Sequence, residues 1–351
     1  MFRRAFTLPF KLFNIPVRLD LSFLFILPLF AFLIGSRVEP GRFITVTTPY
    51  ILGLIAALGL FTSVLIHEIG HALTARRYGV ETKEITLWLL GGVAQLTDLP
   101  KQRGAEAVVA IAGPLTSAAL ALIFFALRWL TGWSDAVFFV VNYLALTNVA
   151  LAVFNLLPAL PLDGGRVLRS LLALRFSYLR ATKFAANTSQ IIAVLLGVFG
   201  LLNGQFLLVA VAFFVYNAVQ AETRYAVVTN ALEGKTAADL MTSEVTTAQP
   251  DMSLETFRRL AYFQKRSCYP VIGESGELLG FAKLHDAENE VGTVADIITP
   301  SETLFLNESA LTAFKRLGES QTGRIAVLDE AGRLAGIIGK TDIMRLLQTE
   351  T

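Results

Sequence analysis

The first two thirds of the chain contain long apolar runs without a single charged side chain. These runs lie at residues 21–36, 43–67, 107–127, 136–162 and 184–221. A helix needs about 20 apolar residues to cross the hydrocarbon of a bilayer, so these lengths suit membrane spans. The last run is long enough for two spans, because the turn-like cluster at 202–205 divides it. The pattern therefore predicts six transmembrane helices.

Beyond residue 230 the hydrophobic pattern changes to that of a soluble α/β domain, and the segment repeats itself. The sequence ADLMT at 238–242 recurs as ADIIT at 295–299, and PVIGESGELLG at 270–280 recurs as AVLDEAGRLAG at 326–336. Each copy predicts the order strand, helix, strand, acidic turn, strand, helix, and needs its twin to bury its apolar face. We therefore expect these parts of the chain: a membrane core at 1–225, a linker at 226–235, and repeats at 236–290 and 291–351.

The composition supports a membrane protein and excludes several other classes. The chain is 54% hydrophobic and only 17% charged, whereas soluble domains are about 25% charged. Residues 1–230 hold 18 Lys and Arg against 10 Asp and Glu, and the remaining residues hold 12 against 18. The near-neutral total, without a basic stripe, provides no electrostatic footprint for nucleic acid. A single cysteine, Cys268, excludes internal disulfides and Cys-ligated metal clusters.

The basic residues that flank the apolar runs predict how the chain is oriented. Arg and Lys gather before the first run, directly after the second, and between residues 166 and 183. The positive-inside rule places these segments in the cytoplasm, and an even number of spans returns the C-terminal part to the same side. A cleaved signal peptide is not expected, because no small-residue cleavage site follows the first run. We expect a multi-pass protein of the cell membrane with its N-terminus and repeats in the cytoplasm.

The sequence HEIGH at 67–71 ends the second apolar run. Positions i and i+4 share one face of a helix, so His67 and His71 can ligate one metal ion. Glu68 lies beside them and could take a proton from a metal-bound water. A chance match is the alternative, but ionisable residues in a membrane helix are costly and usually functional. The motif therefore predicts a hydrolytic zinc site.

A catalytic zinc ion usually has three protein ligands and one open position. The remaining histidine, His285, lies in the repeats, so the third ligand should be a carboxylate near the membrane. Asp163 is the only acid between Asp135 and Glu222, and it lies in NLLPALPLDGGR at 155–166. The second and fourth spans run in the same direction, so Asp163 should arrive near the two histidines. A loop acid in a Pro/Gly turn is the alternative.

HEIGH at 67–71 followed by NLLPALPLDGG at 155–165 resembles the site-2 protease family of intramembrane zinc metalloproteases. The resemblance covers roughly residues 10–220. GGVA at 91–94 falls where that family has a membrane-dipping β-hairpin, and Ser117 departs from the Asn of many relatives. The resemblance implies one Zn²⁺ per chain and a general base; the implied ligands are His67, His71 and Asp163, and the implied base is Glu68.

Two further features of the sequence could contact a substrate. Asn155 could donate a hydrogen bond to the developing oxyanion or to the substrate backbone, or could instead hold the adjacent proline-containing turn. The stretch Leu87–Leu96 is too short to span and has Gly91 and Gly92 at its centre. It predicts a hairpin that dips into the membrane, or a surface loop. A transmembrane substrate must unwind to expose its carbonyl groups, and the hairpin edge could bind the unwound segment as an added strand.

The repeats resemble a pair of cystathionine-β-synthase-type (CBS) modules. In such modules a Thr or Ser followed by Asp often contacts an adenine nucleotide, and GIIGKTD at 336–342 provides Thr341 and Asp342. The first copy reads GFAKLHD at 280–286, so His285 replaces the hydroxyl group. The resemblance implies that ATP, ADP or AMP modulates substrate access. The alternative is a purely structural or dimerising module, and CBS pairs commonly form homodimers.

Two functions of different classes fit this sequence. The favoured function is intramembrane zinc proteolysis of membrane-anchored regulators, such as an anti-sigma factor or a membrane-held transcription factor. The alternative is a CBS-gated channel or cation transporter whose His and Glu side chains bind the transported ion. Asp163 together with HEIGH favours the protease, because three ligands and a base make a hydrolytic site without a continuous polar path.

Overall fold

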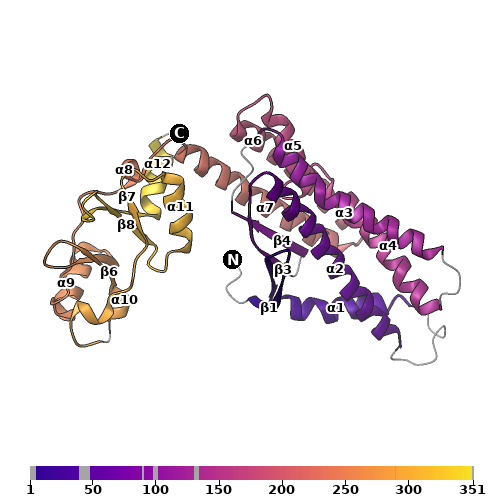
Figure 1. Cartoon of the computed structure of the whole chain (residues 1–351), viewed down its shortest axis with the longest axis horizontal. Helices are drawn as coiled ribbons and strands as arrows, with labels where there is room; N and C mark the ends of the chain where they lie inside the picture. Colours follow the sequence, from indigo (N-terminus) through magenta and orange to yellow (C-terminus); the bar gives the residue numbers. More distant parts are fainter. Residues whose placement is uncertain are drawn as a thin grey trace. The chain divides into compact units, whose positions relative to one another are not determined.

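The chain folds into two compact units that meet in sequence between Thr223 and Arg224, a helical unit and an α/β unit (Figure 1). The computed structural model describes residues 5–38, 48–88, 91–97, 102–129, 134–288 and 290–349. The expected linker at 226–235 begins inside a long helix that ends at Leu232. Its bounds, like those of the other expected parts, stay predictions.

In the part of the chain that the structure describes, five helices are long and apolar enough to cross a membrane. They are α2 (Thr48–Arg77), α3 (Ala105–Arg128), α4 (Asp135–Asn155), α6 (Tyr178–Leu202) and α7 (Phe206–Leu232). The turn between α6 and α7 contains Gly204 at a φ of 66°, which confirms the predicted break. Helix α1 (Phe23–Gly35) has only 13 residues, or about 20 Å, so the sixth span stays a prediction.

The outer faces of these helices carry large apolar side chains. More than half of the residue surface is exposed at Leu122 on α3, Ile191 and Leu195 on α6, and Phe213 on α7. Large exposed apolar patches of this kind mark surfaces that contact a membrane or another protein. The helical unit therefore has the surface of a protein that lies in lipid.

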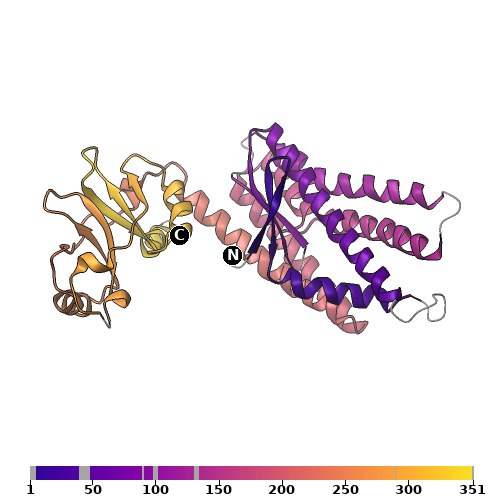
Figure 2. The same ribbon diagram turned by 60° about the horizontal axis from the view of Figure 1, so that its bottom comes forward.

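A four-stranded sheet with the order β1-β2-β3-β4 belongs to the helical unit. Strands β3 (Thr82–Trp88) and β4 (Gly91–Leu96) pair antiparallel, which confirms the hairpin predicted at 87–96. Strands β1 (Ala5–Leu12) and β2 (Ile15–Asp20) form a second hairpin, for which the sequence analysis made no prediction. Strand β2 also pairs in parallel with β3. Figure 2 shows the four strands grouped beside the helices of this unit.

The sheet lies against the half of α2 that carries the HEIGH motif. Ile15 and Ile85 are buried against Ala72 of α2, and Val17 is fully buried. In β3 the polar Thr86, next to Ile85, is buried as well. The sheet therefore fixes β4 beside the motif.

The α/β unit contains the two predicted repeats, and each completes the fold of the other. The first repeat contains α8 (Ala237–Leu240), α9 (Leu254–Gln264), β5 (Cys268–Ile272), β6 (Leu278–Lys283) and α10 (Leu284–Ala287). The second contains the short helix η1 (Val294–Ile297), β7 (Thr303–Phe305), α11 (Ala310–Glu319), β8 (Arg324–Leu328), β9 (Leu334–Gly339) and α12 (Lys340–Thr349). The expected first strand is present as β7 in the second repeat, whereas in the first it is reduced to one pair between Ala248 and Val271.

The start of each repeat is hydrogen-bonded to the other repeat. The amide of Ala237 donates to Glu308, and the amide of Val294 donates to Met252. Leu240 correspondingly packs in the core of the second repeat, whereas Val294 packs in that of the first. This exchange is the physical reason why neither copy could bury its apolar face alone.

Cys268 packs in a small core that joins the two repeats. Its neighbours include Phe281 and Ile337, one from each repeat. Burial raises the pKa of the Cys268 thiol to about 11, so the thiol stays protonated at neutral pH. This cysteine is therefore a packing residue of the core.

Candidate metal centre

Helix α2 places the two histidines of HEIGH on one face. His67 and His71 are 3% and 7% exposed, and their ring centroids lie 4.8 Å apart with the rings nearly perpendicular. The two Nε2 atoms are 3.2 Å apart. The spacing of four residues thus brings two imidazole nitrogens to one point, as the sequence predicts.

Helix α3 orients both imidazole rings from the other side. Nδ1 of His71 donates to the carbonyl oxygen of Val109 at 2.8 Å, and Nδ1 of His67 lies 2.9 Å from Oγ of Ser117. A carbonyl oxygen only accepts, so Nδ1 of His71 carries the proton and the Nε2 of a neutral ring presents a lone pair. Metal-ligating histidines are commonly held in this way through the nitrogen that does not face the metal. Ser117, the departure from the family pattern, supplies this contact for His67.

Gly113 of α3 allows this close approach. A methyl group at this position would lie 2.2 Å from Nε2 of His71 and 2.6 Å from Nε2 of His67. Neither distance is compatible with an unmoved side chain, so only glycine fits the observed packing. No pattern in the sequence assigns a role in the site to Gly113 or Val109.

Asp163 is the first residue of α5 (Asp163–Ala173) and completes the cluster. Its Oδ2 atom lies 3.1 Å from Nε2 of His67 and 3.2 Å from Nε2 of His71. The next two residues, Gly164 and Gly165, pack so closely on the loop at 156–160 that a methyl group would lie 2.2 Å from its backbone. The two glycines therefore let α5 begin where its carboxylate can reach the histidines.

The cluster has the dimensions of a tetrahedral zinc site. Zinc binds nitrogen and oxygen at about 2.0–2.2 Å, so two ligand atoms of a tetrahedral ion lie about 3.3 Å apart. The three distances between the ligand atoms are 3.1, 3.2 and 3.2 Å. These spacings suit one metal ion held between the three atoms. Among the described residues, this is the one group of three side chains able to hold a metal ion.

Glu68 and strand β4 form the wall of the cavity beside the cluster. Oε2 of Glu68 accepts a hydrogen bond from the amide of Ala94 at 3.0 Å. Gly92 faces the same carboxylate, because a methyl group there would lie 2.6 Å from Cγ of Glu68. The cavity has a volume of about 280 Å³, and its lining includes the three possible ligands together with Glu68, Gly91, Gly92, Asn155 and Arg166.

Asn155 lines this cavity, but its side chain is hydrogen-bonded to the backbone of its own helix. Its Nδ2 atom donates to the carbonyl oxygen of Leu151 at 3.0 Å. This contact lies within α4 and not in the proline-containing turn that follows. The position at the cavity fits the substrate contact, and the role itself stays a prediction.

The residues singled out in the repeats have very different surroundings. Thr341 is exposed near the start of α12. Asp342 is buried; it accepts hydrogen bonds from Oγ1 of Thr242 at 2.8 Å and from the amide of Gly339 at 2.7 Å. The side chain of His285 is 90% exposed and lies 3.6 Å from Glu288. Asp342 therefore ties the start of one repeat to the end of the other.

Comparisons with known proteins agree with this site. The family models that match are Peptidase family M50, over 55–134 and 132–199, and the CBS domain, over 237–290 and 294–349. Zinc metalloprotease MJ0392 of Methanocaldococcus jannaschii is 32% identical over 96% of this chain and 95% of its own. The putative zinc metalloprotease sll0528 of Synechocystis is 29% identical over 97% of this chain and 94% of its own. A solved site-2 protease from M. jannaschii is 32% identical, covers 62% of this chain and 95% of its own, and has a TM-score of 0.47.

The apolar helices and the buried ligand cluster define a zinc-dependent peptidase of the membrane. With similarity over almost its full length to a zinc metalloprotease, the chain belongs to peptidase family M50, and its C-terminal part consists of two CBS domains. The two resemblances found in the sequence are thereby confirmed. The family assignment favours a peptidase over the alternative of a CBS-gated channel or transporter.

Proposed function

We propose that this chain hydrolyses peptide bonds within or near the transmembrane segments of membrane-anchored regulatory proteins. His67, His71 and Asp163 are the proposed zinc ligands, and Glu68 is the proposed general base. The convergence of three ligand atoms within 3.2 Å of one another carries this proposal. The helices around the site support a substrate that lies in the bilayer, such as a membrane-held transcription factor or anti-sigma factor.

Glu68 is the residue of this site that can move a proton. A zinc ion, when bound, would act as a Lewis acid and bring the pKa of a water toward about 7. The hydrogen bond from Ala94 fixes one oxygen of the Glu68 carboxylate and leaves the other oxygen able to take a proton from the attacking water. Glu68 can then pass this proton to the leaving amine. Asn155, at the wall of the same cavity, can orient the carbonyl oxygen of the substrate.

Strand β4 is the proposed docking edge for the unwound substrate. It stands at one end of the order β1-β2-β3-β4, so within the described sheet it is paired on one side. The amide of Ala94 points toward Glu68, and the amide of Gly92, two residues away, points to the same side of the strand. A substrate strand added here would bring its carbonyl groups into the cavity.

Replacing Gly92 tests this edge. We expect Gly92→Ala to lower the cleavage rate at least about tenfold, because the added methyl group meets Cγ of Glu68 at 2.6 Å and displaces the base. Gly92→Pro also removes the amide and should cost more. The measurement is cleavage of a transmembrane substrate in proteoliposomes, with zinc content as the control. Undiminished cleavage by Gly92→Pro would remove β4 as the docking edge.

The experiment that tests the proposed function compares membrane proteomes. Cells with the native chain and cells with Glu68→Gln should differ in at least one membrane-anchored protein that persists intact in the variant. Because only a substrate depends directly on the base, this comparison identifies the substrate as well. A native chain that contains zinc and yet leaves every anchored protein uncut would contradict the proposal.

We also propose that the CBS domains bind ATP, ADP or AMP and thereby modulate cleavage. Support comes from Thr341, which is exposed, and from a cavity of about 450 Å³ in the same unit, lined in part by Ser243, Thr247 and Arg333. Titration calorimetry of the full chain should detect one of these nucleotides. Thr341→Ala should weaken its binding about tenfold, the loss of one or two hydrogen bonds, without a change in Tm. Absence of heat with all three nucleotides would favour a structural or dimerising module.

The same proposal includes the orientation of the chain in a cell membrane. Arg76 and Arg77 end α2, and Arg and Lys gather again between 166 and 183. By the positive-inside rule these ends face the cytoplasm, and so do the N-terminus and the CBS domains. A homodimer through the CBS domains is part of the proposal too.

A further inference from the structure

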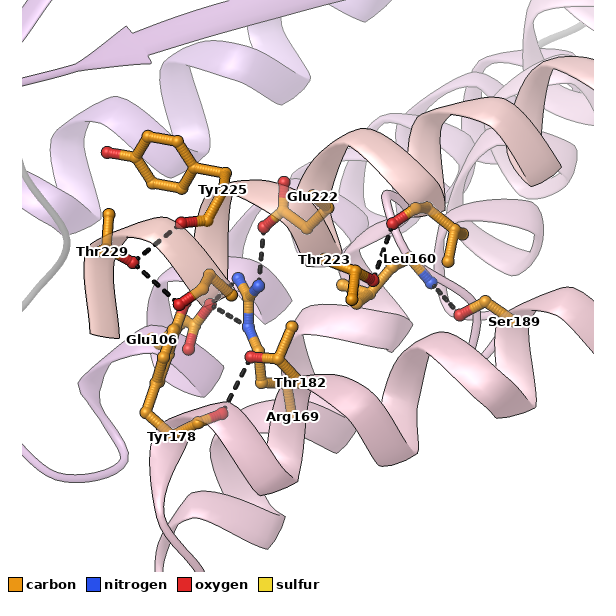
Figure 3. A network of polar contacts seen from close by, with 12 residues as sticks. Glu106, Leu160, Arg169, Tyr178, Thr182, Ser189, Glu222, Thr223, Tyr225 and Thr229 are labelled. Atoms are coloured by element: carbon orange, nitrogen blue, oxygen red, sulfur yellow. Dashed lines mark hydrogen bonds and ion pairs between the residues drawn. The ribbon is translucent and has the colours of Figure 1, made fainter. Parts of the chain in front are cut away.

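A buried arginine on α5 lies outside the cavity and has no part in the reaction described above. Arg169 is 1% exposed, and its guanidinium group lies between two carboxylates from two other helices (Figure 3). Its Nη1 atom donates to Glu222 of α7 at 2.6 Å, and its Nε atom donates to Glu106 of α3 at 3.0 Å. Nη2 also contacts Glu106. The ring of Tyr178 lies against the same group, with 5.2 Å between Cζ and the ring centroid.

Such a network is a poor means of stabilising a fold. Removing charged groups from water is costly, and well-packed apolar residues often replace a buried ion pair without loss of stability. The fork of an arginine nevertheless fixes the distance and the orientation of its partners more closely than apolar contacts do. The network at Arg169 is therefore best understood by asking which parts of the molecule it holds in register.

The first contact of Arg169 ties the helix that carries Asp163 to the helix that orients the histidines. Arg169 follows Asp163 by six residues on α5, about 9 Å along the helix. Glu106 lies near the start of α3, the helix of Val109 and Ser117. A second bond runs between the same two helices, since the amide of Ala107 donates to Oγ of Ser170 at 3.1 Å. The imidazole rings belong to α2 but are hydrogen-bonded to α3. The distance between α5 and α3 therefore affects how far the carboxylate of Asp163 lies from these rings.

The second contact of Arg169 ties α5 to α7. Glu222 lies in α7, which continues without a break to Leu232. Val228 and Leu232 of this helix pack in the core of the second CBS domain. The helix that carries Glu222 therefore also contributes to the core of the second CBS domain, so a rotation or shift of α7 would act on Arg169.

We propose that Arg169 is a positioning residue of the zinc site. Through Glu106 it holds α5 at a fixed distance from α3, and with it the carboxylate of Asp163. Through Glu222 it makes this distance depend on the position of α7. The inference rests on the proposed function, because it takes the cluster of His67, His71 and Asp163 to be the metal site.

The test measures metal binding by the full chain in detergent. The metal-free protein is titrated with Co²⁺, whose visible absorption bands report the geometry of the ligands, and its Tm is measured in parallel. Arg169→Lys keeps the charge and loses the fork, whereas Glu222→Gln keeps the shape and loses the charge. The matched control is Glu84→Gln, which removes the negative charge from another partly buried pair, with Arg18 at 3.0 Å, away from α5.

We expect Arg169→Lys to weaken cobalt binding about tenfold or more, the usual effect of losing a residue that orients a ligand, and to shift the absorption bands. Glu222→Gln should produce a smaller change in the same direction, and Glu84→Gln should leave affinity and bands unchanged. If Arg169→Lys does not fold, Glu222→Gln decides the question. Native affinity and native bands in the variants, with a lower Tm alone, would overturn the positioning role. A native chain that binds neither cobalt nor zinc would overturn the proposed function as well.

Discussion

Glu68→Gln should leave a protein that contains zinc and does not cut. Glutamine has the size of glutamate, and its side-chain oxygen can still accept the hydrogen bond from Ala94. It cannot take a proton from water, and the loss of a general base typically costs 10²- to 10⁴-fold in rate. Zinc content should stay at one ion per chain, because the substitution leaves the three proposed ligands, His67, His71 and Asp163, unchanged.

The measurement is single-turnover cleavage of a transmembrane substrate in proteoliposomes, with zinc content determined on the same sample. Glu68→Asp is the matched variant, since it keeps the carboxylate and draws it back by one methylene. Its rate should fall between those of the native chain and Glu68→Gln. Loss of zinc in Glu68→Gln would make Glu68 a ligand instead of the base, and an unchanged rate would assign the proton transfer to another group.

Most of the proposed metal site could be predicted from the sequence, because two of the proposed ligands are side chains at helical spacing. Two histidines four residues apart must share a face, and the direction of the spans brings Asp163 to the same end. The structure brings the two imidazole nitrogens and a carboxylate oxygen of Asp163 together, which is the geometry that the proposed ligands need. The break between α6 and α7 and the hairpin at β3 and β4 also follow from local patterns, which need no knowledge of distant contacts.

The contributions of α3 could not be predicted in the same way. The group that orients His71 is the backbone carbonyl of Val109, and every residue has such a group, so the sequence contains no mark of it. The need for glycine at 113 arises from two rings that approach from another helix. The exchange of Ala237 and Val294 between the repeats is also a tertiary contact, and periodicity predicts only that the two copies need each other.

Asp342 shows how a motif and a structural role can coincide. The resemblance implies that this residue contacts a nucleotide, but its carboxylate binds Thr242 and the amide of Gly339. A variant of Asp342 would therefore lose a tie between the repeats along with any contact to a ligand. For this reason the exposed Thr341 is the better position at which to test nucleotide binding.

Gly113→Ala should weaken zinc binding although it replaces none of the proposed ligands. The added methyl group would lie 2.2 Å from Nε2 of His71, so either α3 or the imidazole rings must move. Overpacking of this kind costs about 1–3 kcal/mol, and the cost falls on the geometry that holds the metal. We expect zinc affinity to fall about 10- to 100-fold, in the range seen when the support of a ligand is lost, with cleavage reduced in parallel.

The matched control is Gly197→Ala in α6, where the added methyl group would meet Cβ of Ala212 at an ordinary 3.5 Å. This variant should keep its zinc affinity and should be as stable as the native chain or more so, since alanine favours the helix over glycine by about 1 kcal/mol. Competition with a chromophoric chelator measures both affinities. Native zinc affinity in Gly113→Ala would show that the rings can hold the metal without α3 in contact. The hydrogen bonds that the two rings form with Val109 and Ser117 would then have no part in orienting the proposed ligands.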